Sequence, residues 1–143
     1  MKRTLQFIAS AVALIGIADA MYLTIAHYTA TEVPCALTGA GCEMVLTSSY
    51  AQIFGLPLGV YGAVSYFAAF ALAILAAYGN QTAWKLFGVL ATVMAGFSAY
   101  LIFVQAYYIR AFCQYCLLSA GVTTVLSVLV LVAWRMNPRR TLE

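Results

Sequence analysis

The fold is decided by the stretch PLGVYGAVSYFAAFALAILAAY (57–78), GNQT (79–82) and AWKLFGVLATVMAGFSAYLIFVQAYYI (83–109). A helix rises about 1.5 Å per residue, so each apolar run is long enough to cross a hydrocarbon layer of about 30 Å. The polar turn between the runs is short, and short connections join antiparallel neighbours. We therefore expect two adjacent membrane-spanning helices here.

Two further apolar runs complete the pattern, approximately at residues 5–28 and 117–134. The chain has 143 residues, of which 65% are hydrophobic and only 8% are charged, whereas soluble domains carry about 25% charged residues. Lipid must therefore surround most of the molecule. The sequence predicts an all-α integral membrane four-helix bundle, with residues 1–143 as a single domain. The net charge of +3 is scattered, which argues against a nucleic-acid partner.

The long connection between the first two predicted helices, roughly residues 29–56, holds most of the polar and turn-forming residues. Residues 42–54 have enough helix formers for a short interfacial helix, although Thr47-Ser48-Ser49 weakens that prediction.

Basic residues indicate the orientation, because short cytoplasmic loops are enriched in Lys and Arg. One side of the predicted bundle carries nearly all of them: Lys2, Arg3, Lys85, Arg135, Arg139 and Arg140. The other side has Arg110 with Glu32 and Glu43. We expect a multi-pass protein of the cell inner membrane with both termini cytoplasmic and all cysteines outside. Ala18-Asp19-Ala20 resembles a signal cleavage site, but the apolar pattern continues beyond it, so we expect no cleavage.

The four cysteines form two pairs, Cys35 with Cys42 in the long loop and Cys113 with Cys116 at the predicted start of the fourth helix. Cysteines three apart on a helix share a face and close a disulfide with little backbone movement. Free N–H groups at a helix start stabilise a thiolate, and Arg110 would add positive charge. The close pair predicts a redox-active centre, and the loop pair suits a relay that reaches the aqueous side.

Two other interpretations of the cysteines remain open. Extracytoplasmic cysteines commonly form structural disulfides, although a lipid-embedded bundle has little need of them. A zinc or iron–sulfur site usually shows two close pairs, and the spacing of Cys35 and Cys42 is too wide for a zinc knuckle. We predict no metal site.

The first apolar run, residues 5–28, contains one acidic side chain, Asp19, and one histidine, His27. Either one would serve as a proton relay in a functional interpretation. In a structural one, Asp19 makes a hydrogen-bonded contact between helices and His27 is solvated near the outer interface. The structural interpretation is favoured for both.

Several segments resemble the bacterial branch of the vitamin K epoxide reductase family. They are Cys42 to Ala51 (CEMVLTSSYA), Phe54 to Gly62 (FGLPLGVYG), Phe112 to Cys116 (FCQYC), and Tyr22-Leu23-Thr24 followed by His27. The four cysteines match in order, and the resemblance covers nearly the whole chain.

The resemblance implies a four-helix bundle around a quinone, with disulfide formation as the outcome. Cys116 would react with the quinone, Cys113 would exchange with Cys42, and Cys35 would face the partner. That partner would be a periplasmic or extracytoplasmic thioredoxin-fold protein of the DsbA type. Ser48 matches a serine of the family and would hydrogen-bond near the redox centre or act as a helix cap.

Phe54 and Tyr61 are aromatic candidates to line a dry quinone site, with lipid contact or core packing as the alternative. The chain has Ala51 and Ala120 where the animal enzymes have an asparagine and a tyrosine that are linked to binding the vitamin K oxygens. Ubiquinone or menaquinone is therefore the expected quinone. The alternatives are a DsbB-type oxidase, in which the two cysteine pairs occur in the reverse order, and a non-catalytic membrane protein with structural disulfides.

Overall fold

The structure is a computed structural model that describes residues 2–29 and 41–136, with the side chains of residues 2 and 41–43 left undescribed. Its elements follow in chain order: α1 Lys2–Thr29, α2 Gly41–Leu46, η1 Ser49–Ala51, β1 Gln52–Ile53, β2 Leu56–Pro57, α3 Leu58–Ala77, α4 Gln81–Val104, η2 Gln105–Ile109 and α5 Gln114–Met136.

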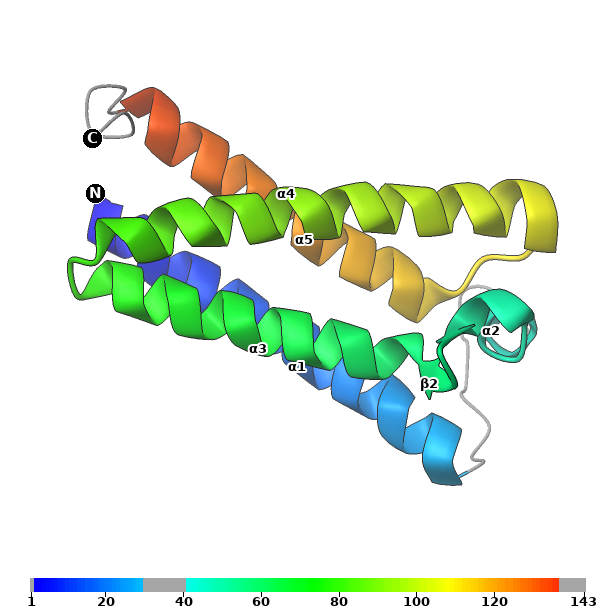
Figure 1. Cartoon of the computed structure of the whole chain (residues 1–143). Coiled ribbons are helices and arrows are strands. Elements are labelled where there is room, and N and C mark those ends of the chain that lie inside the picture. Colours follow the sequence, from blue (N-terminus) through cyan, green and yellow to red (C-terminus); the bar gives the residue numbers. More distant parts are fainter. Residues whose placement is uncertain (1, 30–40, 137–143) are drawn as a thin grey trace.

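Four helices in the described part of the chain are long and apolar enough to cross a membrane: Arg3–Thr29, Leu58–Ala77, Gln81–Ile109 and Gln114–Met136. The all-α four-helix membrane fold expected from the sequence is confirmed. α1 begins and α5 ends at the same end of the bundle as the α3–α4 turn, while α2 and the two short strands lie at the opposite end (Figure 1).

α1 packs against α3 through small residues. Ala9, Ala13, Gly16 and Ala20 recur every three or four residues on α1, and all four are buried. Between membrane helices, small side chains let the backbones approach closely, and dispersion contacts then hold the pair. The two helices run side by side in the bundle (Figure 1).

Tyr66 of α3 fills the space that Gly16 leaves open. Its ring lies so close to Gly16 that a Cβ at that position would overlap it. The Tyr66 hydroxyl is 2.6 Å from the Ser119 hydroxyl and donates to the Ser119 carbonyl of α5 at 3.0 Å. One buried tyrosine therefore ties three helices together.

The outer segment differs from the single short helix expected over residues 42–54. α2 ends at Leu46, and the Ser48 hydroxyl donates to the Val45 carbonyl at 2.7 Å, which closes that helix end. η1 and an antiparallel pair of two-residue strands follow. Phe54 and Gly55 form the turn of the pair with φ of 53° and 79°, the left-handed values that a tight hairpin turn requires at both central residues.

The connection from the third to the fourth spanning helix is also different. α4 continues as a wider π-helical turn, Gln105–Ile109, and Arg110 then adopts a left-handed conformation with φ of 56°. α5 begins at Gln114, three residues before the predicted start at 117. Cys116 therefore lies in the first turn of this helix, and Cys113 immediately precedes it.

Three basic side chains mark the end of the bundle where α1 begins. The Arg3 side chain donates to the Ala77 carbonyl at the end of α3, 3.1 Å away. Lys85 lies in the first turns of α4 and Arg135 in the last turn of α5. These three residues belong to the basic group from which the sequence predicts that this end of the bundle faces the cytoplasm.

The contact between Gly16 and Tyr66 predicts the effect of a single methyl group. Replacing Gly16 with Ala forces the Tyr66 ring away from a position that its bonds to Ser119 hold, so overpacking should cost about 1–3 kcal/mol. The measurement is the thermal unfolding midpoint of the protein in detergent. Gly96→Ala is the control, because its Cβ meets no atom within 4 Å. An equal midpoint for the two variants would contradict the close packing described.

Candidate active site

Cys113 immediately precedes α5, and its carbonyl accepts a hydrogen bond from the Leu117 N–H at 3.0 Å. Its side chain is fully buried. The Cys116 thiol donates a hydrogen bond to the Cys113 sulfur, and the backbone N–H groups of Cys116 and Tyr115 donate to it as well. Despite burial, which acts in the opposite direction, these bonds lower the pKa of Cys113 from 9.0 to about 7.

The cause of this shift differs in part from the sequence-based expectation. Donors at the helix start do stabilise the thiolate form of Cys113. The Arg110 side chain, however, is exposed, and hydrogen bonds rather than its charge lower the pKa of Cys113. The left-handed backbone at Arg110 instead turns the chain from η2 toward α5.

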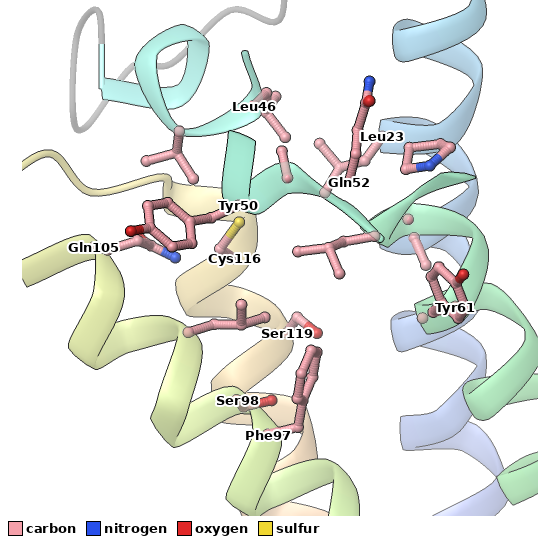
Figure 2. A pocket seen from close by; sticks show the side chains of 18 of the residues that line it. Leu23, Leu46, Tyr50, Gln52, Tyr61, Phe97, Ser98, Gln105, Cys116 and Ser119 are labelled. Atoms are coloured by element: carbon pink, nitrogen blue, oxygen red, sulfur yellow. The ribbon is translucent and has the colours of Figure 1, made fainter. Parts of the chain in front are cut away.

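Cys116 lies in the first turn of α5 and is half-buried. It lines a cavity of about 680 Å³ enclosed by residues of α1, α3, α4 and α5 and of the outer segment, and Cys113 does not. Figure 2 shows the Cys116 sulfur in this cavity, with Ser119 and Ser98 further along the wall. Cys116, Ser119 and Thr123 share one face of α5 because they are three and four residues apart.

Gln105, which the sequence analysis did not single out, holds both cysteines. Its Oε1 accepts a hydrogen bond from the Cys113 N–H at 3.1 Å, and its side chain also hydrogen-bonds the Cys116 sulfur. Gln105 is 2% exposed, so the bonds form away from water, where leaving a polar group unpaired is costly. The signal available in the sequence was an amide side chain within an otherwise apolar run.

Asp19 also lines the cavity, and it is 7% exposed. Its Oδ1 has no hydrogen-bond partner among the described residues, so the interhelical hydrogen bond expected for Asp19 is not found at that oxygen. His27 has an exposed side chain, as expected, and its Nε2 lies 3.4 Å from Nε2 of Gln52 at the cavity wall.

The three residues suggested as quinone contacts lie in different places. Ser48 and Tyr61 line the cavity, but their hydroxyls donate to backbone carbonyls, Ser48 to Val45 and Tyr61 to Ile53 (2.9 Å). Phe54 does not line it: its side chain is 96% exposed at the tip of the hairpin. The left-handed turn at Phe54 and Gly55 directs this side chain outward, a geometry that the aromatic residue type alone did not reveal.

The structure describes the loop cysteines only in part. Cys35 lies outside the described residues, and Cys42 is described only as a backbone position in α2. Val45, three residues further along α2, is buried in a cluster with Cys113. Three residues make about one helical turn, so Cys42 precedes Val45 by one turn of α2.

The pKa of Cys113 predicts a pH titration. In a variant with Cys35 and Cys42 both replaced by Ser, the ultraviolet absorbance of thiolate should rise as the pH increases through about 7, because a lowered pKa lets Cys113 lose its proton there. Cys116→Ala removes the largest stabilising hydrogen bond, so the midpoint should move upward. The same midpoint in both proteins would show that Cys116 does not stabilise the Cys113 thiolate.

Comparisons with known proteins identify the family of this chain. The model of the vitamin K epoxide reductase family matches residues 7–131. The chain is also similar to the thiol-disulfide oxidoreductase LTO1 of Arabidopsis thaliana, with 36% identity over 111 residues, which are 71% of this chain. The matched region spans only 29% of that relative's length. Because the family match covers most of the chain, from α1 to α5, the protein belongs to the vitamin K epoxide reductase family.

Proposed function

We propose that this protein is a quinone-dependent thiol oxidoreductase that supports disulfide bond formation. In the proposed reaction the dithiol of a thioredoxin-fold protein gives up two electrons and two protons. A quinone takes up the same number of electrons and protons. The observation that carries the proposal is the division of the close cysteine pair, with Cys116 in the wall of a cavity within the membrane bundle and Cys113 outside it at the helix start.

The chemistry of the pair supports this assignment. A thiolate at Cys113 is the form that attacks and leaves in disulfide exchange, and the lowered pKa of Cys113 makes it available near neutral pH. Cys113 and Cys116 are free thiols in the structure, joined by a hydrogen bond. A disulfide between them needs only a small movement, because they belong to one helical turn.

The residues of the cavity fit a quinone. A volume of about 680 Å³ lies within the range of about 300–1,000 Å³ that small-molecule sites have. Aliphatic and aromatic side chains of the spanning helices make much of the wall, and Asp19, Ser98 and Ser119 supply polar groups. When bound, the quinone supplies an acceptor for two electrons and two protons. At position 51 the wall has the methyl group of an alanine in place of the asparagine that the animal enzymes use toward the vitamin K oxygens. This difference favours ubiquinone or menaquinone over the vitamin K epoxide.

The loop pair is the proposed link to the aqueous side. Because Val45 packs on Cys113 and Cys42 lies one turn earlier in α2, a modest rearrangement would let Cys42 exchange with Cys113. Cys35 would then exchange with the partner. The proposed location of the protein is the inner membrane. The basic side chains at the other end of the bundle support an orientation with all four cysteines on the side away from the cytoplasm.

A DsbB-type oxidase would give the same net reaction with the cysteine pairs in the reverse order. This chain has the close pair after the separated pair, and its family match supports the order proposed here. A purely structural role for the cysteines leaves unexplained why Cys116 opens into a cavity that already holds polar groups.

The direct test is quinone consumption by the purified protein with a reduced thioredoxin-fold protein, followed by quinone absorbance. One quinone should be reduced per dithiol, and Cys116→Ala should lower the rate to the uncatalysed background. Ser127→Ala is the control, because it lies on the same helix outside the cavity wall and donates to Ala91. No consumption of ubiquinone or menaquinone by the unaltered protein would refute the proposal.

The order of the relay gives a second test. With Cys116 replaced by Ser, no inner thiol resolves the exchange, so a disulfide between Cys42 and Cys113 should accumulate and appear in mass spectra of unreduced peptides. Cys35→Ser should keep quinone reduction by dithiothreitol but impair reduction by the protein partner. Equal loss of both activities in the Cys35 variant would mean that the loop pair is not a relay.

A further inference from the structure

We propose that the carboxyl group of Asp19 contacts the quinone in the cavity and supplies one of the two protons that quinone reduction requires. The inference rests on the proposed function and goes beyond it, because it assigns a catalytic residue other than a cysteine. It also replaces the structural role that the sequence alone favoured for Asp19.

The position of Asp19 is the first argument. It belongs to α1 within a membrane-spanning segment, is 7% exposed, and lines the same cavity as Cys116. Its Oδ1 has no hydrogen-bond partner among the described residues. A polar oxygen without a partner in such a place is costly, so a side chain with a purely structural role would be expected to pair both oxygens with a neighbouring helix.

The second argument is that several other polar groups of the cavity already have hydrogen-bond partners. The Tyr66 hydroxyl pairs with Ser119, and the Thr123 hydroxyl donates to the Ser98 hydroxyl at 3.3 Å and to a backbone carbonyl. Asp19 is the carboxyl among the described residues that line the cavity, and its Oδ1 takes part in none of these bonds. A carboxyl group both donates and accepts hydrogen bonds and exchanges its proton, which hydroxyls do far less readily.

Proton balance is the third argument. Oxidation of the pair forms the Cys113–Cys116 bond, sends two electrons to the quinone and releases the thiol proton of Cys116. The thiolate of Cys113 has already given its proton to the aqueous phase, so the hydroquinone needs one more. Asp19 supplies that proton and regains one from the outer aqueous phase. A negative charge on Asp19 would raise the pKa of Cys113, so the reactive thiolate forms more readily while Asp19 keeps its proton.

The test uses Asp19→Asn in the purified full-length protein, because Asn keeps the size and hydrogen bonding of Asp but exchanges no proton. After reduction of the cysteines, ubiquinone is mixed in and its absorbance followed over a single turnover at several concentrations. The rate at saturating quinone should fall about 100-fold or more, the typical contribution of a positioned proton donor. The quinone concentration at half-maximal rate should change by less than about 3-fold, because the contact is kept.

Infrared difference spectroscopy gives a readout independent of turnover. Asp19 is the single aspartate of the chain, so a carboxyl C=O band that shifts when quinone binds to the oxidised protein should vanish in the Asn variant. Ser10→Ala is the matched control: Ser10 is buried on the same helix, outside the cavity wall, and donates to the Gln6 carbonyl at 2.9 Å. This variant should keep both the rate and the band.

The outcomes separate the two proposals. If the unaltered protein reduces quinone and Asp19→Asn does so at a rate within about 3-fold of it, Asp19 is not a proton donor and this inference alone fails. A band that quinone does not shift, or that survives in Asp19→Asn, also overturns it. If the unaltered protein reduces no quinone, the proposed function fails and this inference falls with it.

Discussion

The close contact between α1 and α3 is the constraint on which the rest of the structure depends. In lipid no hydrophobic force drives two apolar helices together, so their pairing relies on how closely the backbones approach. Small residues on α1 allow that approach, and Gly16 makes room for the ring of Tyr66. Tyr66 then reaches Ser119 of α5. The same contact places Asp19, one turn beyond Gly16, at the cavity wall.

The second decisive feature is the irregular backbone between α4 and α5. A π-helical turn and a left-handed residue are both less favourable than regular helix, and such departures are frequent where function requires a particular geometry. Here they let Gln105 lie beneath the start of α5, where its side chain bonds both the Cys113 N–H and the Cys116 sulfur. The Ala111 N–H donates to the Gln105 carbonyl at 3.2 Å, so the chain beyond Arg110 returns to Gln105 before α5 begins.

The site thus separates two environments over a single helical turn. Cys113 is buried under α2 among backbone donors that stabilise a thiolate, whereas Cys116 opens into the cavity between the spanning helices. In the proposed reaction one thiol exchanges with other thiols and the other meets a lipid-soluble acceptor, so the two need different surroundings. Positions one helical turn apart can satisfy both, because the N–H groups at the start of a helix are free to bond Cys113 while the first turn carries Cys116 to the cavity.

The sequence by itself determined the class of fold and the cysteine pair, because hydrophobic length and the spacing of Cys113 and Cys116 are local properties that need no knowledge of neighbours. It failed where distant residues decide the outcome. The outward direction of Phe54 depends on a left-handed turn, and the roles of Gln105 and Tyr66 depend on which helices meet. Whether Asp19 pairs with another helix or faces a cavity was decided only by the tertiary structure, because packing fixes what lies opposite a side chain and a periodic apolar pattern does not.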